Sequence, residues 1–347
     1  MSPAPPEPIT TITVVPRDSF AQTQRCLDAL LAVTPAPRRL VYVDGGSPPE
    51  VAAYLRKRAH EHDFALIRSD CLLSPNQARN LTLPYLNTEY TAFLDNDALV
   101  SDGWLARLER CAHETGAAVV TPLLAMGELD DDVLHLATGV SHIGEAHGVR
   151  RFVEHHDGQN GPLGPVLASA TRCETELFEF HAALVRTDAL EAVAPLDEGL
   201  LSICEHGDLG LLIRELGGTV WFEPAVHMTY LPTKRLRGAD RAFFIVRWSE
   251  DWNRRSAKRF VEKWRLSPDD PRVQETVEFG AWVRLHAYRP YRSPFTRVLR
   301  RYARTPRPIV DRVAQRIALR NFRNRAERSG PPFLAHRPTW LGVDVHA

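Results

Sequence analysis

The first 121 residues alternate between short apolar runs and segments with helical spacing. Runs of β-branched and apolar residues predict strands, and apolar side chains three and four residues apart predict the helices between them. The predicted strands cover residues 9–15, 39–43, 64–67, 90–94 and 117–121, and the helices between them cover 20–33, 49–62, 75–86 and 102–114. This alternation is typical of βαβ units. We therefore expect an α/β fold with a mainly parallel sheet and helices on both faces.

The fourth predicted strand ends in two carboxylates, Asp95 and Asp97. Residues two apart in an extended chain point to the same side, so both side chains can face one point beyond the strand. Their charges repel unless a cation joins them, and oxygen ligands suit Mg2+ or Mn2+. Because ligands of open α/β sheets collect at the carboxyl ends of the strands, the motif predicts a divalent ion that holds a phosphorylated substrate.

Further polar residues follow the other predicted strands. Asp44 precedes two glycines after the second strand, and glycines allow a ligand to approach the backbone closely. Asn76 and Arg79 share a helix face, where they either contact a base or phosphate or act as a cap and a surface charge. No G-x-G-x-x-G follows the first strand and no G-x-x-x-x-G-K-[ST] occurs. These absences argue against a nicotinamide-dependent enzyme and exclude a P-loop.

In order and approximate spacing, these motifs resemble those of the family 2 glycosyltransferases, which have the GT-A fold. The resemblance covers about residues 9–230. Its segments are Val15-Pro16, Val43 to Ser47, Asn76 to Asn80, Phe93 to Asp97, Pro195 to Glu198, Glu205 to Leu209 with Arg214, and Pro224 to His227. The resemblance implies an inverting transfer of a sugar from a nucleoside-diphosphate sugar, with a UDP-sugar ranked first, to a hydroxyl of a saccharide or lipid-linked saccharide acceptor.

The resemblance also implies roles for single residues. The residues that would bind the nucleotide-sugar are Pro16, Arg17, Asp44, Asn76, Arg79, Asp95, Asn96 and Asp97. Among these, Asp95 and Asp97 would also hold the Mg2+ or Mn2+ ion, and His227 matches the histidine that often completes the metal site.

The general base is expected in the segment from Glu205 to Asp208. The family usually has Glu-Asp followed two residues later by another Asp, whereas this chain has His206 at the second position. We expect Asp208 to be the base, with Glu205 as an acceptor contact and His206 as the rival base. His181, in the strand before this segment, is a further candidate acceptor contact. Residues 154–157, Glu-His-His-Asp, could suggest a second metal site, but we expect them to form a polar loop.

Charge divides the chain into two parts. The net charge is zero, yet residues 1–230 carry 16 basic and 32 acidic residues and residues 231–347 carry 27 and 11. We expect a disordered tail over 1–8, a GT-A domain over 9–232 and a basic, mainly helical extension over 233–347. Arginines of residues 295–328 alternate with an apolar helical face. This pattern suits contact with an anionic membrane surface, docking onto the acidic domain or a homodimer interface; no nucleic-acid-binding motif is present.

The remaining expectations concern location and rival functions. Five scattered cysteines, no long apolar run and no signal peptide predict a cytoplasmic protein, with peripheral contact at the inner face of the membrane as an option. One rival is a nucleotidyltransferase, disfavoured because the loop after the first strand lacks glycines. The other is a degenerate relative that binds a nucleotide-sugar or acts as a scaffold without catalysis, because of the change at His206.

Overall fold

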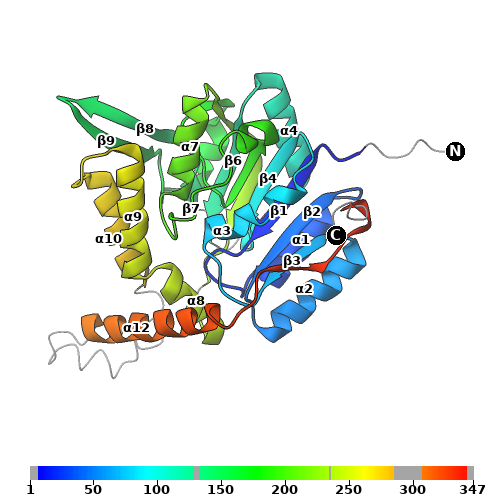
Figure 1. Cartoon of the computed structure of the whole chain (residues 1–347). Helices are drawn as coiled ribbons and strands as arrows, with labels where there is room; N and C mark the ends of the chain where they lie inside the picture. The colour runs from blue at the N-terminus through cyan, green and yellow to red at the C-terminus, as the bar shows by residue number, and fades with distance from the viewer. Residues whose placement is uncertain (1–6, 128–132, 234–235, 285–306, 342–347) are drawn as a thin grey trace.

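The computed structural model describes residues 7–127, 133–233, 236–284 and 307–341. Its main sheet has the strand order β10-β12-β6-β11-β4-β1-β2-β3-β13, with β5 paired to β12 and β7 paired to β6 (Figure 1). These strands are β1 (Thr10–Val15), β2 (Arg39–Gly45), β3 (Ala65–Ser69), β4 (Tyr90–Asp95), β5 (Ala98–Leu99), β6 (Val119–Met126), β7 (Val133–Leu136), β10 (Cys173–Thr175), β11 (Ala182–Arg186), β12 (Val220–Tyr230) and β13 (Phe333–His336).

The strands β3, β2, β1 and β4 form the parallel centre of this sheet. Val15 lies opposite Asp95, and Val14 lies opposite both Leu94 and Tyr42. The carboxyl ends of β1, β2 and β4 therefore meet at one edge, as the alternating pattern predicts. Every residue of β1 and β4 is buried, so the loops at this edge extend from a rigid support.

Helices cover both faces of the sheet because its central strands are apolar on both sides. Ile12 packs in one cluster with residues of α1 (Thr23–Val33), α2 (Pro49–His62) and α4 (Trp104–Thr115). Residues on the opposite face pack against α3 (Pro75–Asn80), α6 (Thr187–Glu191) and α7 (Glu205–Glu215). The short helix η1 (Leu83–Tyr85) follows α3. This layered arrangement is the predicted α/β fold.

Residues 122–176, which lack a clear sequence period, contain regular structure. Beyond β6 and β7 they form β8 (Gly139–Ala146), β9 (Val149–His156), α5 (Leu163–Ser169) and β10. The hairpin of β8 and β9 is a separate antiparallel sheet that extends from the main body (Figure 1). The predicted polar loop at 154–157 is therefore wrong, because Glu154 and His156 belong to β9. The His155 side chain is 73% exposed and that of His156 only 8%.

The C-terminal region packs against the base segment and then returns to the sheet. Its elements are α8 (Gly238–Arg247), α9 (Glu250–Trp264), α10 (Pro271–Arg284), α12 (Arg307–Ala326), β13 and η3 (Thr339–Leu341). Aromatic residues of α9 form part of the core: Trp252, Phe260 and Trp264 share a buried cluster with Leu211 of α7. β13 pairs antiparallel with β3, so a segment from the far end of the chain completes the sheet edge.

Two of the expectations fall wholly or partly outside the described residues. They concern residues 1–6 of the predicted tail and residues 295–306 of the basic segment. Among the described helices, none combines the length and apolar character needed to cross a membrane.

Candidate active site

Three buried side chains converge where β4 ends. Asp95 ends β4 and Asp97 follows it, and the backbone pairing of β4 with β11 places His181 beside them, since the Asp95 amide donates to the His181 carbonyl at 3.2 Å. The Nδ1 atom of His181 lies 3.0 Å from Oδ2 of Asp95. One ligand atom from each of the three residues lies within 4.8 Å of the others. Two carboxylates and an imidazole in this arrangement can hold a divalent cation.

The charges of this group suit a cation. Burial would raise the pKa of Asp95, but His181, Arg17 and Arg79 hold it below its usual value. Burial and the Asp95 charge raise the pKa of Asp97 well above its usual value. Among the described residues, Oδ1 of Asp95 and Oδ1 of Asp97 accept no hydrogen bond. Buried acceptors of this kind need a partner, and a divalent ion between the two carboxylates would supply one.

His227 does not belong to this group, contrary to the expectation. It lies within β12 and pairs with Leu123 of β6. The end of β12 instead brings Tyr230 to the site, where its ring packs against His181 with centroids 4.2 Å apart. The imidazole nearest the two aspartates therefore comes from the residue before β11.

The loop after β1 is held in place by Asn96. Its Oδ1 accepts from the backbone N–H of Arg17 at 3.0 Å, and its Nδ2 donates to the carbonyl of Ser19 at 2.8 Å. The Nε atom of Arg17 lies 3.7 Å from Oδ2 of Asp95. Asn96 therefore positions the predicted nucleotide-binding loop at Pro16 and Arg17 beside the carboxylate pair.

Asp44 is buried at the end of β2, and neighbouring residues of the protein bind both of its carboxylate oxygens. Its Oδ1 accepts from the backbone N–H of Ser47 at 3.0 Å, and its Oδ2 pairs with Arg68. Gly46 has φ +77°, and a Cβ there would lie 2.9 Å from the carbonyl carbon of Cys71, so this turn requires glycine. The turn brings Asp44 to the same edge as the aspartates after β4.

Arg79 pairs with the buried Asp95, and Asn76 in turn bonds to Arg79. Arg79 is fully buried; its NH2 lies 3.6 Å from Oδ1 of Asp95, and its guanidinium lies over the Phe180 ring at 3.6 Å. Burial lowers the pKa of Arg79 to about 10, so it stays charged at neutral pH. Asn76 accepts from Arg79 at 3.2 Å and donates to the carbonyl of Asp197 at 2.9 Å. Both residues are buried, so Arg79 is not the surface charge of the second alternative, and contact with a nucleotide stays a prediction.

A cavity of about 510 Å3 is lined by Arg17 and His181, which contact Asp95, although Asp95 and Asp97 are not among its lining residues. Several of its lining residues can carry chemistry: Arg17, His135, Glu154, His156, Glu179, His181, Glu205, His206, Tyr230 and Arg272. These residues come from the β1 loop, β7, β9, the approach to β11, the start of α7, β12 and α10. Glu205 and His206 of the base segment thus line the same cavity as Arg17 of the β1 loop.

Asp208, the expected base, does not line this cavity. Its carboxylate accepts from Nζ of Lys263 at 2.7 Å and from Nε1 of Trp264 at 2.8 Å, both on α9. Burial raises the pKa of Asp208, and these two donors offset that burial. The expectation is corrected because α9 covers this side of α7, and Asp208 joins the two helices.

His206 lines the cavity and is held by a carboxylate from the hairpin. Its Nε2 lies 3.0 Å from Oε2 of Glu154, and Oε1 of Glu154 accepts from Arg272 at 2.7 Å. Burial would raise the pKa of Glu154, but His206, His156 and Arg272 hold it far below the usual value. Glu154 therefore stays ionised. The sequence reasoning named Glu154 only within a polar loop and missed its contact with His206, although the alternation over residues 149–156 could have indicated a strand.

Glu205 faces the same cavity but is paired with an arginine. Its Oε1 accepts from Arg247 at 3.1 Å, and both side chains are buried. Burial would raise the pKa of Glu205, yet Arg247, Arg17 and Arg79 lower it. Glu205 is therefore a strongly paired carboxylate and a weaker proton acceptor than an imidazole.

Comparison with known proteins places the chain in a family. The model of "Glycosyl transferase family 2" matches residues 15–191. The chain belongs to this family. The transferase has the family's GT-A fold, in which the parallel β3-β2-β1-β4 centre ends at the carboxylate pair.

The individual proteins that the chain resembles have low sequence identity to it. A succinoglycan biosynthesis protein, ExoM of Rhizobium meliloti (strain 1021), is 34% identical over 105 residues, which are 30% of the transferase and 34% of ExoM. The transferase thus matches about a third of that relative's length. Mannosyltransferase PcManGT from Pyrobaculum calidifontis, solved with GDP-Man and Mn2+, is 16% identical with a TM-score of 0.48, covering 91% of the transferase and 82% of PcManGT. GalNAc-T7, solved with UDP, GalNAc and Mn2+, is 15% identical with the same TM-score, covering 78% and 54%.

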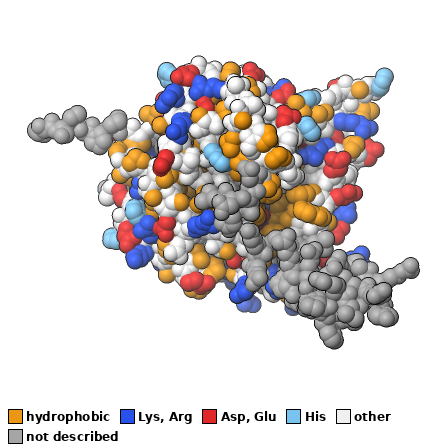
Figure 2. Space-filling model, turned by 180° about the vertical axis from the view of Figure 1, so that it is seen from behind, with side chains coloured by type: hydrophobic (Ala, Val, Ile, Leu, Met, Phe, Trp, Pro, Cys, Tyr) orange, Lys and Arg blue, Asp and Glu red, His pale blue; other side chains and the backbone are white. Residues whose placement is uncertain are grey.

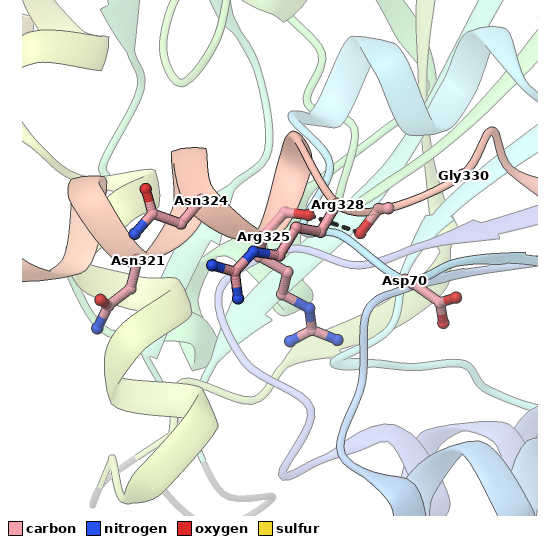
Figure 3. A pocket seen from close by; sticks show the side chains of 7 residues that line it. Asp70, Asn321, Asn324, Arg325, Arg328 and Gly330 are labelled. Atoms are coloured by element: carbon pink, nitrogen blue, oxygen red, sulfur yellow. Dashed lines mark hydrogen bonds between the residues drawn. The ribbon is translucent and has the colours of Figure 1, made fainter.

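A second hollow of about 470 Å3 lies at the end of α12 (Figure 3). It is lined by Asp70, Asn321, Asn324, Arg325, Arg328, Ser329 and Gly330. Figure 3 shows Asp70, from the loop after β3, across the hollow from the end of α12. None of these residues lines the larger cavity, so this hollow is separate from the site around His206.

Proposed function

We propose that the protein is a metal-dependent, inverting glycosyltransferase. Its donor is a nucleoside-diphosphate sugar, with a UDP-sugar ranked first, and its acceptor is a hydroxyl of a saccharide or lipid-linked saccharide. The observation that carries the proposal is the buried group of Asp95, Asp97 and His181 beside a cavity that His206 lines, in a chain whose family is glycosyl transferase family 2.

The cation would be held by Asp95, Asp97 and His181. When bound, it neutralises the charge that grows on the leaving nucleoside diphosphate. An imidazole beside two carboxylates suits Mn2+ better than Mg2+, because nitrogen ligands bind Mg2+ weakly. Arg17 reaches the same edge from the β1 loop, where its guanidinium can pair with the diphosphate.

We infer that His206 is the general base and that Glu154 positions it. Glu154 lies at Nε2, so the ring proton sits on Nε2 and Nδ1 is the basic nitrogen. Nδ1 takes the proton of the acceptor hydroxyl while the oxygen bonds to the anomeric carbon and the bond from that carbon to the phosphate oxygen breaks. The incoming oxygen attacks opposite the leaving group, so the configuration inverts. Glu205, held by Arg247, would contact the acceptor.

Nucleotide binding is the direct test of this function. Thermal unfolding is measured with UDP, GDP or dTDP, each with and without Mn2+. We expect UDP with Mn2+ to stabilise the protein most, by about 2.7 kcal/mol at 100 times its dissociation constant, and the gain to shrink without the cation. A flat response to all three nucleotides would count against the proposal. The anomeric configuration of the product, measured by NMR with a saccharide acceptor, tests inversion.

We also propose that α12 touches an anionic membrane surface at the cytoplasmic face. Arg312, Arg316 and Arg320 are exposed at four-residue spacing, and Val313 and Ile317 beside them are 48% and 56% exposed. By contrast, Figure 2 shows acidic and basic side chains intermixed over the rear of the molecule. A basic helix face with exposed apolar side chains suits the headgroup region of an anionic bilayer.

Vesicle binding tests this surface. Replacing Arg312, Arg316 and Arg320 with glutamine should weaken binding to phosphatidylglycerol-containing vesicles about 100-fold, at about 1 kcal/mol for each arginine. The matched control replaces three exposed basic residues of α9, Arg254, Arg255 and Lys258, and should bind as the wild type does. Equal binding to neutral vesicles would refute the proposal. A dimer detected by ultracentrifugation would also refute it, if the α12 substitutions dissociate that dimer and vesicles leave it intact.

A further inference from the structure

We propose a second divalent-cation site, formed by His135, Glu179 and His181, that takes an ion with a preference for nitrogen ligands, such as Zn2+. It shares His181 with the site of Asp95 and Asp97 but has two ligands of its own, and its test needs neither donor nor acceptor. One nitrogen or oxygen from each of its three residues lies within 4.8 Å of the others. All three side chains line the cavity of about 510 Å3.

The three ligands come from two adjoining segments of the fold. His135 lies on β7, and Glu179 and His181 lie in the turn region just before β11. Oε2 of Glu179 is 2.8 Å from Nε2 of His135 and 3.4 Å from Nε2 of His181. The rings of His135 and His181 are nearly perpendicular, with centroids 5.0 Å apart. Modest side-chain shifts would open these contacts around an ion.

His181 can serve both sites because its two nitrogens face different partners. Nδ1 lies 3.0 Å from Asp95, whereas Nε2 lies 3.4 Å from Glu179. With one ion bound, the other nitrogen keeps its proton. With both sites filled, His181 would supply one nitrogen to each ion and would lose its remaining proton to solvent.

The donor set determines which ion each site prefers. The first site has two carboxylates and one imidazole, which suit Mn2+ or Mg2+, whereas the second has two imidazoles and one carboxylate, which suit Zn2+. Three protein ligands beside a cavity leave a coordination position open for water or an acceptor hydroxyl. His156 adds another nitrogen close by, since its Nδ1 lies 3.7 Å from Oε1 of Glu179.

The competing explanation is that Glu179 only orients His181 by accepting its Nε2 proton, as carboxylates often do behind a metal ligand. Such a role needs one imidazole at the carboxylate. Glu179 instead has His135 and His156 beside it as well as His181, and all of them line the cavity. The convergence of three imidazoles on one carboxylate favours a cation.

Cobalt binding distinguishes the two explanations. Metal-free full-length protein is saturated with Mn2+ and titrated with Co2+, whose visible absorption reports nitrogen ligation, and Zn2+ is then added as competitor. We expect one equivalent of Co2+ to bind and Zn2+ to displace it. His135→Gln should weaken Co2+ binding at least tenfold, whereas His155→Gln, which changes the outward-facing neighbour of His156, should leave it unchanged. Asp97→Asn, which damages only the first site, should retain the cobalt spectrum.

Either of two outcomes would overturn the proposal. Absence of cobalt absorption, or a signal that Asp97→Asn removes and His135→Gln leaves intact, assigns the cluster to the orientation of His181. Circular dichroism and thermal unfolding of each metal-free variant confirm that it is folded before titration. The result of the cobalt titration does not depend on the nucleotide test, because no nucleotide is present in the titration.

Discussion

Substituting His206 with glutamine should lower kcat for sugar transfer by about 100- to 10,000-fold, the usual contribution of a general base. Donor binding should be retained, because His206 is held by Glu154 and does not belong to the group of Asp95, Asp97 and His181. The measurement is transfer kinetics at saturating donor, together with nucleotide binding by thermal shift. Unchanged kcat in this variant, with loss of kcat in Glu205→Gln, would move the role of base to Glu205.

The pH profile tests how Glu154 acts. Burial alone would lower the pKa of His206, but Glu154, Glu179 and Glu205 act in the opposite sense, and the net pKa is raised above 6.5. Since the neutral imidazole is the base, kcat/KM should rise with pH through that raised value and then level off. In Glu154→Gln the raising charge is lost and burial remains, so the rise should move to lower pH. The plateau should fall as well, because the ring is no longer oriented.

Asp208→Asn is the control for this experiment. Asp208 bonds to Lys263 and Trp264 and does not line the cavity. The variant should keep the wild-type pH profile and lose stability by about 1–3 kcal/mol, the usual cost of impairing a buried hydrogen-bonded charge. A large loss of kcat in a fully folded Asp208→Asn protein would contradict our assignment of the base.

Substituting Asp97 with asparagine should lower transfer about 1,000-fold or more, which corresponds to about 4 kcal/mol of transition-state stabilisation. The variant lacks one of the two carboxylates that would hold the cation, and the leaving diphosphate then lacks its counter-charge. Transfer rates across a Mn2+ titration measure the effect. A higher Mn2+ concentration should recover part of the rate, because His181 and Asp95 remain as ligands. The recovery should be incomplete, because one carboxylate is missing.

The matched comparison for the cation site is between two histidines. His181→Gln should raise the Mn2+ concentration needed for half-maximal rate, whereas His227→Gln should leave it unchanged, because His227 lies outside the converging group. If His227→Gln alone changed the Mn2+ dependence, the ligand set derived from the structure would be wrong. Thermal unfolding of both variants separates loss of metal binding from loss of folding.

The residues predicted most directly are those next to strand ends. Periodic apolar runs predicted the strands that became β1, β2 and β4, and parallel pairing then placed the loops of Arg17, Asp44 and Asp95 at one edge. Local sequence suffices here because the polar residue after each strand occupies the same edge in every βαβ unit. The family motif at the start of α7 was likewise recognisable by order along the chain.

The contacts that were missed depend on pairing between distant segments. Glu154 reaches His206 only because β9 pairs with β8 and packs against α10. His181 reaches Asp95 because β11 lies antiparallel beside β4. No local period reports such a partner, since one strand pattern is compatible with many neighbours.

The sequence alone determined that this protein is an α/β chain whose fourth strand ends in a carboxylate pair. It also located a candidate base segment about 110 residues later. Only the tertiary structure decided which side chains of that segment face the cavity and which imidazole stands beside the carboxylates. The physical reason is that the helical period fixes only the relative directions of residues 205, 206 and 208, and not which of those directions faces the cavity. Packing against α9 buries one side, and the hairpin supplies a carboxylate to another.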